Sequence, residues 1–181
     1  MNKKVLLIVA LISAVVGLGY LYQSVPERSE IRTVVMTGQS GEAMGEIKLS
    51  ETKAGVLLSL DLKGLTPNGE HAIHVHETGK CEAPFKSAGG HYNPTDHAHG
   101  MKHPKGHHAG DMPNLKPEND GTIETQILNR KITLGGNMVG ERASVFDGDG
   151  SAIIIHAGAD DHMSQPSGAA GDRIACGVVE Q

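Results

Sequence analysis

Histidine is concentrated in one part of this 181-residue chain: nine of its eleven histidines lie between His71 and His108. Overlapping this region, residues 78–117 show neither the helical period nor the alternation of a strand, and they are rich in Gly, Pro, Asn and Asp. A loop of such length in a small domain is usually functional or disordered, and its polar residues are not those typical of disorder. Metal binding can order such a loop, because the binding free energy becomes folding free energy. We therefore expect a long loop that a metal orders.

The sequence on both sides of this loop is typical of β-strands. Residues 56–62 carry an apolar side chain at every second position, and residues 31–36 are rich in β-branched side chains. Further strands are predicted at 70–77, 121–128, 142–146, 151–156 and 174–180. Asp147-Gly-Asp-Gly150 predicts a hairpin turn between two of them. Because no segment after residue 30 has a convincing helical period, about eight short strands predict an all-β sandwich or flattened Greek-key barrel.

Composition excludes two kinds of nucleic-acid binding. Beyond the N-terminal run, the aromatic residues are Phe85, Tyr92 and Phe146, too few for a platform on which bases stack. The formal net charge is −5, whereas contacts with a phosphate backbone need a positive surface. We expect no nucleic-acid partner.

Residues 1–30 have the pattern of an export segment. Lys3 and Lys4 precede an uncharged, mostly apolar run from Val5 to Tyr22. This run is longer than the usual apolar part of a signal peptide and close to the ~20 residues that span a bilayer. An uncleaved anchor, a cleaved signal peptide and a buried core helix remain the alternatives. The first two predict an exported domain at residues 31–181, on the cell surface or secreted.

The two cysteines, Cys81 and Cys176, agree with export, because an oxidising compartment permits disulfides. Closing a loop of this size would stabilise the fold by ~4–5 kcal/mol on the chain-entropy model. The alternative is a pair of unrelated buried thiols.

Seven residues have the types and intervals of metal ligands. His74 and His76 lie on one side of a predicted strand, and His156 ends an apolar run. Between them in the chain follow His91, His99, His108 and Asp111, at intervals of eight, nine and three residues. Imidazole nitrogens suit copper and zinc, whereas a carboxylate among several imidazoles suits tetrahedral zinc.

The sequence resembles the copper/zinc superoxide dismutases over most of residues 31–181, and its short link from His76 to Cys81 is similar to the bacterial branch. Six motifs carry the resemblance, in the order that the family has them: His74-Val-His76-Glu77, Gly89-Gly-His-Tyr-Asn-Pro94, His99-Gly100, His108-Ala-Gly-Asp111, His156 with Asp160-Asp161, and Gly171-Asp-Arg-Ile-Ala-Cys-Gly177. Two departures, Ile73 for an aromatic residue and Met101 for a glycine, change no ligand. The resemblance implies an eight-stranded Greek-key barrel of immunoglobulin-like architecture, with long metal-binding and electrostatic loops.

The resemblance also implies a role for each motif residue. Copper would be bound by His74, His76, His91 and His156, and zinc by His91, His99, His108 and Asp111. His91 would bridge the two metals and carry a catalytic proton, and Arg173 would guide the anion. Asp160 would join ligand histidines of the two metals, and a Cys81–Cys176 disulfide would tie the metal loop to the last strand. The remaining histidines match no ligand position and are expected to be solvated: His71, His97, His103, His107 and His162.

The implied activity is the conversion of superoxide to dioxygen and hydrogen peroxide by copper redox cycling, with zinc as a structural metal. Residues 71–111 carry four acidic residues and four lysines, so this segment is neutral within a chain of net charge −5 and would repel superoxide least. The alternative is an exported copper/zinc-binding protein without turnover, which would need neither Arg173 nor a bridging histidine. The expected state is a monomer or homodimer, attached to the membrane if the N-terminal segment is uncleaved.

Overall fold

A computed structural model describes residues 31–136 and 139–181; the predicted export segment lies outside them. Nine strands are present among these residues: β1 Ile31–Gly38, β2 Ala43–Thr52, β3 Gly55–Leu62, β4 Ile73–His76, β5 Ile123–Asn129, β6 Ile132–Thr133, β7 Ala143–Ser144, β8 Ser151–His156 and β9 Arg173–Val179. The described part of the chain contains one helical element, a 3-10 turn at Lys86–Ala88. It contains no helix that is long and apolar enough to span a membrane.

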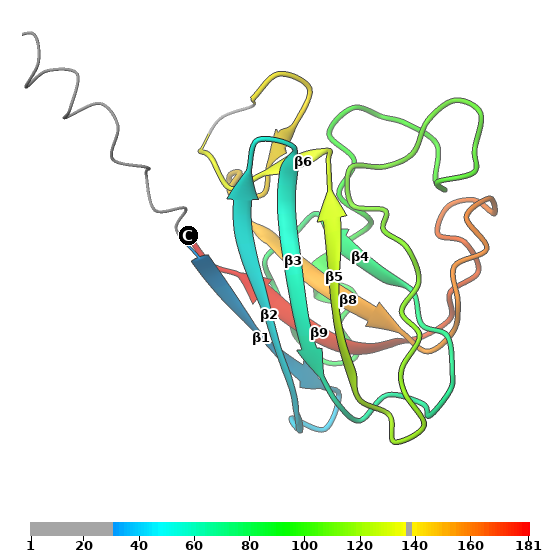
Figure 1. The fold of residues 1–181 in the computed structure, drawn as a ribbon. Coiled ribbons are helices and arrows are strands. Elements are labelled where there is room, and N and C mark those ends of the chain that lie inside the picture. Colours follow the sequence, from blue (N-terminus) through cyan, green and yellow to red (C-terminus); the bar gives the residue numbers. More distant parts are fainter. Residues whose placement is uncertain (1–30, 137–138) are drawn as a thin grey trace, which may run out of the picture.

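Seven of the strands form one antiparallel sheet in the order β4-β8-β9-β1-β2-β3-β5. The sheet curls, so that β2, β3 and β5 lie in front of β4, β8 and β9, with β1 between the two halves (Figure 1). Apolar side chains from both halves meet in one core, among them Val34, Ile47, Leu58, Ile73 and Ile153. The predicted all-β class with a Greek-key barrel is therefore confirmed, and the barrel leaves β4 and β5 as its two edges.

β2 was not predicted, because a bulge breaks its alternation. Met36 pairs with Gly45 but Thr37 pairs with Ala43, so Met44 is an extra residue between them. The buried apolar residues of β2 are therefore Met44, Ile47 and Leu49, which do not stand at every second position. At Gly45, φ is +113°, and a Cβ there would lie 2.1 Å from the carbonyl oxygen of Asp61, so this bulge requires glycine.

The hairpin predicted at Asp147-Gly-Asp-Gly150 is wrong. β7, before it, pairs in parallel with β6, whereas β8, after it, pairs with β4 and β9. All six residues of β8 are buried. Because both sides of β8 are already hydrogen-bonded within the sheet, β7 has no free edge of β8 to join.

The long loop that follows β4 was predicted correctly: from residue 78 to residue 117 it contains the 3-10 turn and isolated bridges but no strand. A disulfide between Cys81 and Cys176 ties its first part to β9, across 95 residues of sequence. Around it, a second apolar cluster packs Phe85 and Ala88 of the loop on Ala152 and Ile154 of β8. The loop is thus fastened to the two strands nearest β4.

Replacing both cysteines, Cys81→Ser with Cys176→Ser, should lower the free energy of unfolding by about 4 kcal/mol, because the unfolded chain regains the entropy of a large open loop. Urea unfolding followed by circular dichroism measures this. A reductant should produce a similar loss in the parent and none in the double variant. An unchanged free energy of unfolding in the variant would contradict this role for the disulfide.

Candidate metal centre

The edge strand β4 positions the centre. Its inner edge pairs with β8, with His74 opposite Ile154 and His76 opposite Ala152. Its other edge forms isolated bridges with the long loop, between His76 and His91 and between His74 and Asp111. Backbone pairing therefore brings loop residues that are 15 or more positions away directly beside the two strand histidines.

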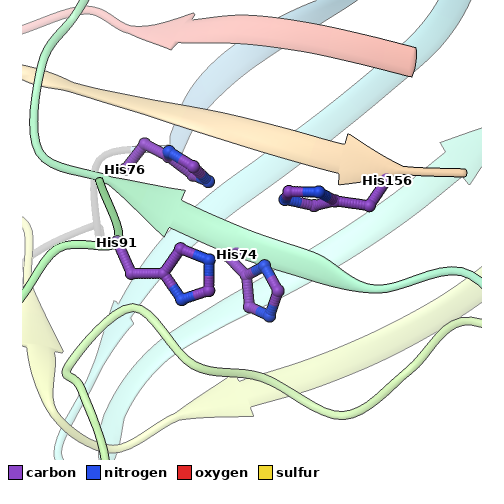
Figure 2. A group of neighbouring side chains, drawn as sticks. All are labelled: His74, His76, His91 and His156. Atoms are coloured by element: carbon purple, nitrogen blue, oxygen red, sulfur yellow. The ribbon is translucent and has the colours of Figure 1, made fainter. Parts of the chain in front are cut away.

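Four histidines form the first group of side chains: His74 and His76 from β4, His156 from the end of β8 and His91 from the loop beside β4 (Figure 2). Each offers a ring nitrogen, and these nitrogens lie within 4.8 Å of one another. Each ring has one buried nitrogen without a hydrogen-bond partner: Nδ1 of His74 and Nε2 of His76, His91 and His156. A buried polar atom without a partner is costly, so four together fit a metal ion that accepts their lone pairs.

The other nitrogen of each strand histidine in this group is held by the protein. Nδ1 of His76 donates to the carbonyl oxygen of Gly89 at 3.1 Å, and Nδ1 of His156 donates to that of Gly171 at 3.2 Å. These bonds fix the tautomer and orientation of each ring, which leaves the lone pair of the unpartnered nitrogen available to a metal.

The second group consists of His91, His99, His108 and Asp111. The three Nδ1 atoms lie close to one oxygen, Oδ1 of Asp111, at 3.0 Å for His91, 3.2 Å for His99 and 3.3 Å for His108. The other oxygen, Oδ2, accepts backbone N–H bonds from Gly100 and His108. Three imidazoles around one carboxylate make a compact donor set of the kind that binds zinc. His91 belongs to both groups, with Nδ1 in this one and its unpartnered Nε2 in the first.

Asp160 joins the two groups from the side opposite the metal-binding atoms. Its Oδ2 lies 2.9 Å from Nε2 of His74, and its Oδ1 lies 2.9 Å from Nε2 of His99. The side chain of Asp160 is fully buried. One carboxylate therefore orients a ring of each group.

Burial keeps the imidazoles of the first group neutral. It lowers the pKa of His74 to about 3 and that of His156 to about 4, and the pKa of His76 also falls well below its usual range. At neutral pH these rings thus carry the free lone pairs that a metal needs.

In the second group, contacts between carboxylates and imidazoles shift the pKa values more than burial does. Burial alone would lower the pKa of His99, but its hydrogen bonds to Asp111 and Asp160 outweigh burial and raise the pKa to about 9. Burial alone would likewise raise the pKa of Asp111, but the imidazoles of His108, His91 and His99 beside it hold that pKa well below its usual range. Asp111 is therefore an anion at neutral pH.

Arg173 lies beside the first group. It begins β9 and pairs with His156 across a bulge in the sheet. Its guanidinium is half-buried and donates to the carbonyl oxygens of Phe85 at 2.6 Å and Gly89 at 2.7 Å. Because Gly89 also accepts the bond from His76, one carbonyl links this cation to a histidine of the group. A surface cavity lies next to it, lined by Arg173, Lys86 and Gln39.

The expectation that His71 is solvated is wrong: its exposed fraction is 1%. Its Nδ1 donates to the carbonyl oxygen of His156 at 2.7 Å, and its Nε2 accepts the backbone N–H of Thr66 at 3.1 Å. Alternation along the strand already indicated this, because His71 shares a face with Ile73 and Val75, which point into the core. His71 therefore supports the backbone of His156 rather than binding a metal.

The other four histidines outside the two groups differ in exposure. His97 is exposed, as expected, whereas His103, His107 and His162 are only partly so. Nδ1 of His107 donates to the carbonyl oxygen of His108, and Nδ1 of His162 lies 3.3 Å from Asp160. His162 thus lies against the carboxylate that joins the two groups.

Comparison with known proteins agrees with this geometry. The family model described as copper/zinc superoxide dismutase (SODC) matches residues 43–179. The chain belongs to the copper/zinc superoxide dismutase family. It is 50% identical over 140 residues to Cu-Zn superoxide dismutase 2 of Aquifex aeolicus, covering 77% of this chain and 80% of that protein. It is 33% identical over 184 residues to the Cu-Zn superoxide dismutase of Escherichia coli K12, covering 94% and 96% of the two chains.

A crystal structure is also similar to this dismutase-family fold. It is a double mutant of a superoxide dismutase-like protein from Bacillus subtilis, with histidine in place of a tyrosine and a proline. The TM-score is 0.77 at 38% identity, and the match covers 82% of this chain and 97% of that chain. Because a fold alone does not establish an activity, the ligand set of this chain must carry the functional argument.

The pKa shifts predict how the metal-free domain responds to acid. His74 and His156 stay neutral when folded but take up protons when unfolded below about pH 6.5, so stability should fall as the pH drops from 6.5 toward 4. His99 acts oppositely: its contribution is complete below pH 6.5 and is lost as the pH rises through about 9.

Urea unfolding of the metal-free domain should therefore show a free energy of unfolding roughly 3 kcal/mol lower at pH 5 than at pH 7. Carboxylates with lowered pKa act mainly below this window. Equal or greater stability at pH 5 would show that the histidines of the first group are not buried in the neutral form.

Proposed function

We propose that residues 31–181 are an exported superoxide dismutase domain that binds copper through His74, His76, His91 and His156, and zinc through His91, His99, His108 and Asp111. One observation carries this proposal: His91 belongs to both groups, with Nδ1 in the second group and Nε2 in the first. An ordinary single-metal site needs no such shared ligand. Each of the two groups contains four residues that can bind a metal, so no ligand is missing from either group.

The donor chemistry supports this distribution of the metals. The first group offers four neutral imidazoles and no carboxylate, which suits copper in both of its common oxidation states. The second offers three imidazoles and an anionic carboxylate, the closed four-ligand set of a structural zinc site. A bound copper ion would supply a one-electron redox centre, which accepts an electron from one superoxide and returns it to another.

The chain's own residues would supply protons and substrate binding. Two superoxide anions and two protons give one dioxygen and one hydrogen peroxide. Nε2 of His91 is buried, has no hydrogen-bond partner and belongs to the first group. Whenever it is not bound to copper, it would hold a proton there and deliver it to the nascent peroxide. Nδ1 of the same ring belongs to the second group, so it would stay bound there while Nε2 takes up and releases the proton.

Arg173 would attract and hold the anionic substrate. Both of its side-chain hydrogen bonds go to backbone carbonyls rather than to an acid, so within the described residues no hydrogen-bonded ion pair neutralises its positive charge. A fixed cation beside the reacting group stabilises an arriving anion without reorganisation.

Export is supported by two separate features. Lys3 and Lys4 precede the apolar run from Val5 to Tyr22. The disulfide between Cys81 and Cys176 is of the kind that persists in an oxidising compartment. Residues 1–30 would then act as a signal peptide or as a membrane anchor with a short linker.

Substitution of a histidine of the first group alone tests the copper assignment. His156→Ala should reduce superoxide consumption at least a hundredfold and leave one zinc per chain, because His156 lies outside the second group. Metal content by mass spectrometry and pulse-radiolysis rates measure both effects. His97→Ala, at an exposed histidine in neither group, is the matched control and should keep full activity. Full activity in His156→Ala would contradict the assignment. A parent that binds both metals without turnover would instead indicate a carrier.

Arg173→Ala should slow superoxide consumption about tenfold while both metals remain bound, because the guanidinium contacts carbonyl groups and no ligand nitrogen. Added salt should slow the parent more than the variant, as the Debye length falls from ~30 Å at 0.01 M to ~10 Å at 0.1 M. Lys53→Ala, in the β2–β3 turn, removes the same charge as a control. Equal rates per bound copper for the parent, Arg173→Ala and Arg173→Glu would leave Arg173 a purely structural role.

A further inference from the structure

Two loops meet at the hydrogen bond between His99 and Asp160. His99 belongs to the long loop after β4, and Asp160 belongs to the loop between β8 and β9; the two loops lie at the same side of the barrel (Figure 1). Both residues are buried, with exposed fractions of 0% and 3%. The orientation of the His99 ring thus depends on how firmly two loops without strands are held together.

Gln165, from the second loop, holds the backbone of His99. Its Oε1 accepts the N–H of His99 at 2.9 Å, and its Nε2 donates to the carbonyl oxygen of His99 at 2.9 Å. The same Nε2 donates to the carbonyl of Met163, which fixes the amide in its own loop. One side chain therefore pairs with both backbone groups of His99, as a neighbouring strand would.

Asn114, from the first loop, holds Asp160 in the same way. Its Oδ1 accepts the N–H of Asp160 at 2.9 Å, and its Nδ2 donates to the carbonyl oxygen of Asp160 at 2.9 Å. The arrangement is reciprocal, because each loop supplies one amide that pairs with the backbone of the key residue in the other loop.

The second loop also covers the bond between the two key residues. At Gly168, φ is +67°, and a Cβ there would lie 1.7 Å from Oδ1 of Asp160 and 2.7 Å from Nε2 of His99. Only a residue without a side chain can approach the pair this closely.

We propose that Gln165 and Asn114 are paired positioning residues, which lock the His99–Asp160 pair from opposite loops and thereby slow the release of zinc. This inference rests on the zinc assignment made above. Neither residue offers an atom to a metal-binding group. Gln165 acts through the backbone of His99, a proposed zinc ligand, and Asn114 acts through the backbone of Asp160, which orients the His99 ring. Loss of such outer contacts typically weakens metal binding 10- to 100-fold.

The test measures zinc release from the zinc-loaded full chain into excess chromogenic chelator at neutral pH. Gln165→Met keeps the length of the side chain and removes both amide groups, so zinc should leave about ten times faster. Gln165→Glu should also speed release, because a carboxylate cannot donate to the carbonyl oxygen of His99. Gln126→Met is the matched control, since Gln126 lies on β5 and donates to Ser59, and its release rate should equal that of the parent.

A double variant, Gln165→Met with Asn114→Ala, tests the reciprocity. Because both amides hold one pair of residues, their combined effect on the release rate should be smaller than the product of the two single effects. Cobalt in place of zinc gives a second readout: its visible absorption should change in the Gln165 variants, which a mere loss of global stability would not cause.

Zinc release from Gln165→Met and Gln165→Glu at the parent rate, with an unchanged cobalt spectrum, would contradict the positioning role of Gln165. If the effect on the release rate in the double variant equals the product of the two single effects, the two amides act independently, which would contradict their paired action. A parent chain that binds no zinc at all would contradict the proposed function itself, so the two failures are distinguishable.

Discussion

The imidazole of His91 is the constraint on which the rest of the site depends. Its Nδ1 contacts Asp111 in one group of ligands, and its Nε2 is a free, buried nitrogen of the other. A ring can serve two groups only if both are built around it at fixed distances. The structure meets this requirement with backbone pairing rather than with side chains alone: His91 pairs with His76, and Asp111 pairs with His74.

One edge of the barrel holds these residues at fixed distances. β4 presents two histidines on one face, β8 ends at His156, and the partner of His156 across the sheet is Arg173. The long loop has no strand of its own between residues 78 and 117, so its order comes from contacts at particular points. Those points are the disulfide to β9, the bridges to β4, and Asp111. One oxygen of Asp111 lies beside three imidazoles, and the other accepts two backbone N–H bonds.

Some of this could be predicted from the sequence. Alternation located β3, and the absence of any period located the loop, because these signals depend only on neighbouring residues. The proposed ligand set followed from six ordered motifs that resemble one family. β2 was missed because the extra residue Met44 breaks its period, and the hairpin before β8 was wrong because pairing partners are set by the whole sheet. Gln165 was not identified either, since its contact with His99 spans 66 residues and leaves no local pattern.

Location of both metals in crystals of the loaded domain tests the central claim most directly. Anomalous scattering at the copper and zinc absorption edges distinguishes the two ions within one crystal. We predict copper among His74, His76, His91 and His156, zinc among His91, His99, His108 and Asp111, and the His91 ring bound to both. Metals in exchanged positions, or a His91 ring bound to neither ion, would contradict the account.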